Sequence, residues 1–103
     1  MAYDSAVKVV WDQSKNDANR KKHGVSFEEA CALFTGGHDY LEIFDDAHSD
    51  DEDRFLAIGP IARGVVLVAY SEREVETIRI ITARRATKRE TDWYRAYRRG
   101  RAQ

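Results

Sequence analysis

Hydrophobic and polar positions divide the chain into two halves with different periods. The N-terminal half predicts a short β-branched strand at Val7–Trp11 and then two helices, the first over Gln13–His23. Asp12 is placed to cap this helix and Gly24 to end it. Nearly every position between them is polar, so the helix must lie on the surface or contact something charged.

A capping box opens the second predicted helix. Ser26 stands three residues before Glu29, the spacing at which each side chain bonds the backbone N–H of the other residue. Apolar side chains follow at helical spacing, and Gly36–Gly37 ends the segment. We therefore expect a short helix with one apolar face.

After residue 40 the period changes to two. The strand candidates are Tyr40–Phe44, Arg54–Ile61, Val65–Ser71 and Val75–Thr82. Tight connections between the last three predict an antiparallel meander, and the apolar run Val65–Ala69 predicts an interior strand covered on both faces. A second capping box, Thr87 with Glu90, begins a C-terminal helix that ends near Arg99.

The element order β–α–α–β–β–β–β–α predicts one α+β domain over residues 1–103, in which an antiparallel β-sheet packs against two N-terminal helices and one C-terminal helix. Trp93 and Tyr97 are four residues apart and share a helix face. We expect their rings to dock on the sheet, with base stacking as the other interpretation. Residues 1–6 and 99–103 are expected to be flexible ends.

Composition narrows the class of protein. At 103 residues and 11.9 kDa the chain has the size of one domain. Its 43% apolar and 11% aromatic residues argue against disorder, and its single cysteine excludes an intramolecular disulfide and a Cys-rich zinc site. No stretch approaches the ~20 apolar residues of a membrane span, and no signal peptide is visible, so we expect a small soluble intracellular domain.

The net charge of −1 conceals a segregation of charge. Seven acidic residues and no lysine or arginine lie between Glu42 and Asp53, whereas nine basic and two acidic residues lie between Arg79 and Arg101. That second segment carries +7 and is a candidate site for an anionic partner, either nucleic acid or an acidic protein. The alternative is a solvated helix face.

No metal-ligand spacing, calcium loop, P-loop, dinucleotide-binding turn or serine nucleophile elbow occurs in the sequence. Polar residues in unusual places remain. Arg79 interrupts the apolar run Ile78–Ile81, where a cation is costly unless it is paired or faces a groove. Two interpretations stay open: an ion pair with Glu72 across a hairpin, or a phosphate bound on an open sheet face.

Strand alternation limits how Arg79 can act with Arg84. In a regular strand these two residues point to opposite faces of the sheet. They share a face only if the strand ends or bulges before Arg84. Any site that uses both arginines depends on that break.

Three spaced motifs resemble the BrnT family of bacterial toxins. They are Trp11-Asp12-x-x-Lys15-x-x-x-Asn19-x-x-Lys22-His23-Gly24-Val25-Ser26-Phe27-Glu28-Glu29-Ala30, Asp45-x-x-His48-Ser49-x-x-Glu52-x-Arg54-Phe55-x-x-Ile58-Gly59, and Ile78-Arg79-Ile80-Ile81-x-Ala83-Arg84-x-Ala86-Thr87-x-x-Glu90. The resemblance covers about Val9–Tyr94. It implies a RelE-like fold, cytoplasmic RNA cleavage without a metal or other cofactor, and neutralisation by a BrnA-like antitoxin that also binds operator DNA.

In the reaction implied by this resemblance, the RNA 2′-hydroxyl attacks its own phosphate and leaves a cyclic phosphate and a free 5′-hydroxyl. The step needs a base, an acid and cations that face the developing charge. The candidate catalytic residues are His23, Arg54, Glu72, Arg79 and Arg84, with the arginines on the phosphate and His23 or Glu72 transferring protons. The candidate RNA contacts are Lys22, Arg85, Lys88 and Arg89.

Non-catalytic interpretations of these residues stay open. His23 could be a C-terminal helix residue favoured by the helix dipole, and Arg54 could pair with Asp51 or Glu52. The chain as a whole could be a noncatalytic protein-binding or regulatory module that uses its acidic and basic surfaces. If the toxin interpretation holds, we expect a hetero-oligomer with the antitoxin, and a homodimer is a further possibility.

Overall fold

The computed structural model describes residues 7–37, 39–50, 52–74 and 76–101. Its elements are β1 (Lys8–Val10), α1 (Gln13–His23), α2 (Phe27–Thr35), β2 (Leu41–Phe44), the 3₁₀ turn η1 (Asp46–His48), β3 (Phe55–Ile61), β4 (Gly64–Glu72), β5 (Thr77–Arg85) and α3 (Lys88–Arg101). The predicted order of helices and strands is confirmed. Three elements run further than predicted: β4 spans Gly64–Glu72, β5 continues to Arg85, and α3 continues to Arg101. The predicted start of the last strand, Val75, lies outside the described residues, as do residues 1–6.

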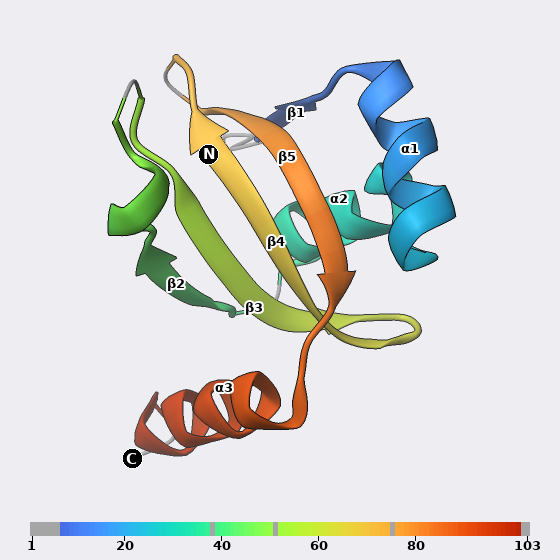
Figure 1. Ribbon diagram of the computed structural model, residues 1–103. Helices are drawn as coiled ribbons and strands as arrows, with labels where there is room; N and C mark the ends of the chain where they lie inside the picture. Colours follow the sequence, from blue (N-terminus) through green and yellow to red (C-terminus); the bar gives the residue numbers. More distant parts are fainter. Residues whose placement is uncertain (1–6, 38, 51, 75, 102–103) are drawn as a thin grey trace, which may run out of the picture.

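The five strands form one mixed sheet in the order β1-β5-β4-β3-β2 (Figure 1). From β2 to β5, each strand pairs antiparallel with the next strand along the chain, which confirms the predicted meander. The prediction of a wholly antiparallel sheet is wrong at one edge, because β1 runs parallel to β5, with Lys8 opposite Thr77. A tight hairpin imposes antiparallel pairing, but no turn joins β1 to β5, so packing decides their direction.

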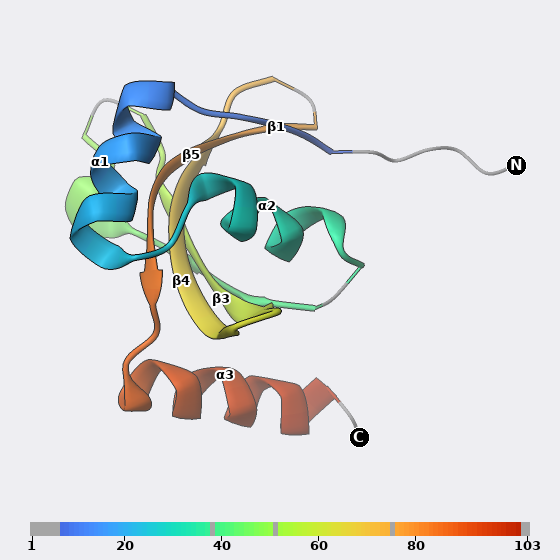
Figure 2. The same cartoon turned by 90° about the vertical axis from the view of Figure 1, so that its right-hand side faces the viewer.

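The three helices occupy different positions around the sheet (Figures 1 and 2). α2 packs on one face, where Phe27 and Leu33 are buried against Val68 and Ile80 of the central strands. α1 runs beside β5, and α3 crosses the end of the sheet near β3. The sheet face opposite α2 is called the open face below. β4 is the central strand, and its residues 66–71 are all buried, as its apolar run predicted.

α1 joins the sheet through one buried asparagine, Asn19. Asn19 donates from Nδ2 to the Ala83 carbonyl at 2.7 Å and to the Val25 carbonyl at 2.9 Å. Its Oδ1 accepts from the Ala83 backbone N–H at 3.2 Å. Asn19 therefore satisfies backbone groups of β5 beyond the reach of β1, where an open edge would otherwise remain. The polar composition of α1 thus reflects an edge-covering role as well as a surface position.

α3 docks through tyrosines and ion pairs. Tyr94 and Tyr97 are half-buried, whereas Trp93 is 45% exposed. Trp93 therefore does not dock as predicted, while Tyr97 is half-buried with the Arg101 guanidinium 5.8 Å from the centre of its ring. At the far end of the helix, Arg98 and Arg101 approach Asp39 at 3.5 and 3.2 Å.

Gly59 of β3 packs against α2 and against the chain before β2. A Cβ at this position would lie 2.6 Å from Leu33 Cδ1 and 2.9 Å from Tyr40 Cβ. Because overpacking typically costs about 1–3 kcal/mol, we expect Gly59→Ala to lower the free energy of unfolding by about that amount in urea denaturation. Gly100→Ala is the control, since no atom lies within 4 Å of a Cβ there. Equal stability of the two variants would contradict this prediction.

Candidate functional site

A β-bulge in β5 decides which side chains share the open face. The register between β4 and β5 shifts between Ala69 and Tyr70, and Ile81 is left without a partner. The extra residue reverses the alternation that would put Arg79 and Arg84 on opposite faces. Both arginines therefore lie on the open face. This is the break on which a site using both of them depends.

Ser71 of β4 lies between two of the predicted site arginines. Arg79 is its partner in β5. Arg54 directly precedes β3, in which Phe55 pairs with Tyr70, so alternation puts Arg54 on the open face as well. With neighbouring strands about 4.8 Å apart, the backbones of Arg54 and Arg79 are about 10 Å apart. The Ser71 Oγ is buried between them and has no hydrogen-bond partner among the described residues.

Neither Arg54 nor Arg79 forms an ion pair within the part of the chain that the structure describes. For Arg54, the expected alternative partner Glu52 instead approaches Arg73 at 4.0 Å, and Asp51 lies outside the described residues. Both arginines are only half-buried. As far as the described residues show, their guanidinium groups are open to a ligand on the open face.

Two predicted site residues face the other side of the sheet. Glu72 pairs with Ile78, on the α2 side, so the ion pair with Arg79 considered from the sequence does not form in the described structure. Arg85 also faces the α2 side, and its guanidinium donates to the Arg63 carbonyl at 3.2 Å. The sheet therefore does not bring these two residues together with the open-face arginines.

Arg84 is held by the first turn of α3. Its two terminal nitrogens donate to the two carboxylate oxygens of Glu90, each at 2.9 Å. These bonds raise the pKa of Arg84 and lower the pKa of Glu90. Glu90 also completes the predicted capping box with Thr87. Sequence reasoning identified the capping box but missed the pairing with Arg84, because an arginine on a strand and a glutamate on the next helix share no local spacing.

The lowered pKa of Glu90 makes part of the stability depend on pH. The contribution is fully present above the pKa of an unfolded glutamate, about 4.3, and is lost as pH falls through the lower folded pKa. We expect Glu90→Gln, which keeps the capping geometry, to lower the urea midpoint at pH 7 and to approach wild type on acidification. Asp92→Asn is the control, since its pair with Lys88 is exposed. A midpoint difference that is constant with pH would contradict the prediction.

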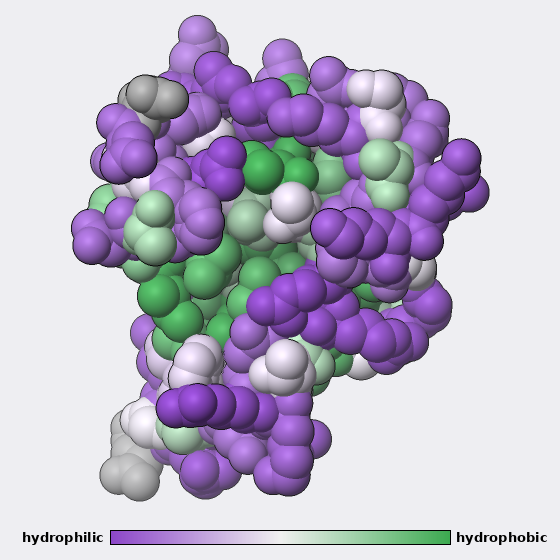
Figure 3. All heavy atoms as spheres, in the orientation of Figure 1, coloured by the Kyte–Doolittle hydropathy of each residue, from purple (hydrophilic) through white to green (hydrophobic). Residues whose placement is uncertain are grey.

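The open face has an apolar floor within a hydrophilic rim. Figure 3 shows hydrophobic atoms over the middle of the sheet, and α1, the η1 region and α3 surround them. Leu67 and Ala69 of β4 belong to this face and are 5% and 8% exposed.

Lys22 and His23 end α1 at the rim beside β5. They line a shallow hollow with Ile81 and Thr82 of β5. His23 is half-buried and Lys22 is exposed. These two residues therefore approach the open face from the β5 side, as a site around Arg79 and Arg84 requires.

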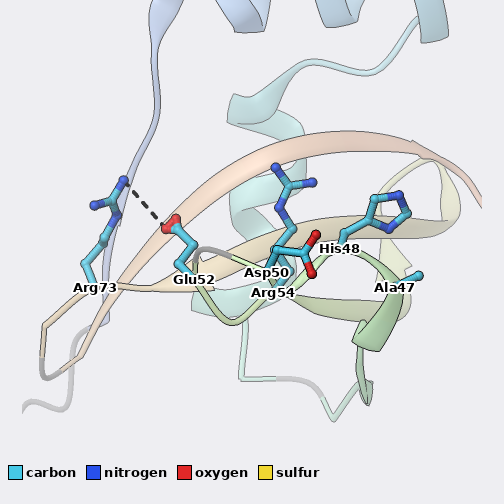
Figure 4. Close-up of a pocket in the computed structure, with 6 residues that line it drawn as sticks. All are labelled: Ala47, His48, Asp50, Glu52, Arg54 and Arg73. Atoms are coloured by element: carbon cyan, nitrogen blue, oxygen red, sulfur yellow. Dashed lines mark ion pairs between the residues drawn. The ribbon is translucent and has the colours of Figure 1, made fainter.

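A second hollow, of about 540 Å³, lies at the opposite rim. Its lining residues are Ala47, His48, Asp50, Glu52, Arg54 and Arg73. In Figure 4 the side chains of Arg54 and His48 extend to the same side of the loop, with the Asp50 carboxylate between them. Arg54 thus lines this hollow and also flanks Ser71 on the open face.

The remaining predicted RNA contacts begin α3. Lys88 pairs with Asp92 at 3.0 Å, and the Arg89 guanidinium lies 5.5 Å from the centre of the Trp93 ring. Among the described residues, no cluster of three or more His, Cys, Asp or Glu side chains could hold a metal ion. None of the described helices is long and apolar enough to cross a membrane.

Comparisons with known proteins bear on the fold and the family of this chain. The sequence model of the family described as "Ribonuclease toxin, BrnT, of type II toxin-antitoxin system" matches residues 11–90. The crystal structure of the Brucella abortus ribonuclease toxin BrnT has the same fold, with a TM-score of 0.61 and 22% sequence identity, over 81% of this chain and 100% of that chain. No curated protein sequence matches. Since the family match includes α1, the η1 region and β5, this chain belongs to the BrnT family of ribonuclease toxins of type II toxin–antitoxin systems.

Proposed function

We propose that this chain is a RelE-like, metal-independent endoribonuclease that cleaves RNA in the cytoplasm and inhibits translation. The observation that supports this most is that Arg54 and Arg79 flank Ser71 on the open face and form no ion pair among the described residues. An arginine fork donates two parallel N–H bonds to non-bridging phosphate oxygens. The apolar floor beside the arginines is a surface on which bases can lie.

In the proposed step, the 2′-hydroxyl oxygen forms a bond to phosphorus while the bond from phosphorus to the 5′-oxygen breaks. A base removes the 2′ proton and an acid protonates the departing 5′-oxygen. Arg79 and Arg54, on either side of Ser71, stabilise the extra negative charge of the pentacovalent phosphorane. Because the nucleophile belongs to the substrate, the protein supplies only charge, orientation and proton transfer.

Lys22 and His23 at the β5 rim are proposed RNA contacts, and His23 is a candidate for proton transfer. Lys88 and Arg89 extend the basic surface along α3. Glu72 and Arg85 are not part of this proposal, because their strand positions face the α2 side.

An antitoxin partner follows from the type II toxin–antitoxin family. We propose a BrnA-like antitoxin that covers the open face and through which the complex binds operator DNA. The charge of the segment from Arg79 to Arg101, +7 in all, favours an acidic segment of that partner. Such a complex is a hetero-oligomer, with or without a dimer of this chain.

The test is cleavage of a defined single-stranded RNA by the purified chain in EDTA. The expected products carry 2′,3′-cyclic phosphate and 5′-hydroxyl ends. The same assay with translating ribosomes covers a toxin that acts only on ribosome-bound RNA. Absence of cleavage under both conditions would favour the alternative, a noncatalytic binding module.

A further inference from the structure

We infer that His48, oriented by Asp45, is the proton-transfer residue of the proposed ribonuclease site. The inference rests on the proposed function. That reaction needs a base and an acid, and the inference assigns one of these two roles to His48. It concerns the hollow beside Arg54, at the rim opposite His23.

The two side chains form a histidine–carboxylate pair. His48 Nδ1 lies 3.0 and 3.2 Å from the two carboxylate oxygens of Asp45. A carboxylate accepts only, so Nδ1 carries the proton in this pair and Nε2 is left as the nitrogen that can exchange one. The Asp45 side chain is 15% exposed and the His48 side chain is 65% exposed. The orienting group is therefore shielded, while the imidazole can reach a substrate.

Backbone bonds fix the turn that carries His48 against Arg54. The Asp45 N–H donates to the Arg54 carbonyl at 2.8 Å. The Ser49 hydroxyl donates to the Asp45 carbonyl at 2.7 Å and accepts from the Arg54 N–H at 2.9 Å. Both backbone groups of Arg54 are thus used to hold the η1 turn. A pre-organised site requires that the phosphate-binding cation and the proton-transfer group have fixed relative positions.

The direction of the side chains agrees with this role. In Figure 4 the His48 ring and the Arg54 guanidinium extend to the same side of the loop. The other charged groups that line the hollow are Asp50, Glu52 and Arg73, of which the last two approach each other at 4.0 Å. A phosphate bound by Arg54 would therefore lie on the same side of the loop as the imidazole, with the Asp50 carboxylate between them.

His23, the histidine singled out from the sequence, lacks this support. It ends α1 in a half-buried position, and among the described residues its side chain has no hydrogen-bond partner that would orient the ring. A cation at this end of a helix is favoured by the dipole alone. In the sequence, Asp45 stands three residues before His48, and the η1 turn brings the two side chains together.

The experiment compares His48→Ala, Asp45→Asn and His23→Ala with wild type in the RNA cleavage assay. We expect His48→Ala to slow cleavage by about 10²–10⁴-fold and added imidazole to restore part of the rate. Asp45→Asn should slow cleavage as well, because it removes the orienting charge and leaves the backbone bonds to Arg54 in place. Circular dichroism and urea midpoints should remain at wild-type values, since the imidazole is largely exposed.

A substrate with sulfur in place of the bridging 5′-oxygen identifies the direction of proton transfer. A thiolate leaves without protonation, so near-wild-type cleavage of this RNA by His48→Ala would assign His48 as the acid. Rescue by imidazole alone would assign it as the base. Either result supports the inference.

Full activity of His48→Ala beside a slow Arg79→Ala would overturn the inference and leave the ribonuclease proposal standing. A slow His48→Ala that neither imidazole nor the sulfur substrate rescues would also overturn it, because a structural role would explain the loss. An inactive wild type would overturn the ribonuclease proposal itself.

Discussion

Arg79→Ala should slow RNA cleavage by about 10²–10³-fold, the loss found when one pre-organised donor to a developing oxyanion is removed. Arg79 lies beside the buried Ser71 and forms no ion pair among the described residues, so its charge is not committed to the fold. The variant should retain the wild-type circular dichroism spectrum. Initial rates of cleavage in EDTA measure the effect.

Arg85→Ala is the matched control for Arg79. It removes the same charge from the same strand, but on the α2 side of the sheet. We expect cleavage within a few-fold of wild type, because only a diffuse electrostatic contribution is lost. Equal losses for Arg79→Ala and Arg85→Ala would mean that overall charge, and not the geometry of the open face, attracts the RNA.

Asn19→Ala should lower the free energy of unfolding by about 2–4 kcal/mol. The Asn19 amide forms three hydrogen bonds. Its loss leaves the Ala83 N–H, the Ala83 carbonyl and the Val25 carbonyl buried without these partners. Each unsatisfied buried group costs about 1–3 kcal/mol, with partial relief where water can enter. Urea denaturation at pH 7 measures the change.

Asp17→Ala, two residues earlier on the exposed side of α1, is the control for Asn19. Its stability should stay within about 0.5 kcal/mol of wild type, as for most surface substitutions. Since α1 carries Lys22 and His23 to the open face, Asn19→Ala should also weaken RNA binding at temperatures where the protein remains folded. A loss of stability below that of Asp17→Ala would show that α1 is held by other contacts.

Local sequence determined the helices, the capping boxes and the antiparallel meander. Ser26 with Glu29 and Thr87 with Glu90 each form the expected reciprocal bonds, because the partners are three residues apart and the backbone alone brings them together. The hairpin between β3 and β4 follows for the same reason, since its turn is short. The resemblance to the BrnT family, recognised in the spaced motifs, is likewise a property of the sequence and is confirmed by the family match.

The tertiary structure alone decided which of the polar residues act together. The sequence allowed Arg79 and Arg84 to share a face only through a break in the strand, and the bulge at Ile81 supplies it. The parallel pairing of β1, the bond network of Asn19 and the pair of Arg84 with Glu90 join residues that no turn connects. Periodicity gives each residue a face within its own element. Register between elements depends on which packing buries the core and satisfies every backbone group, and that is a property of the whole chain.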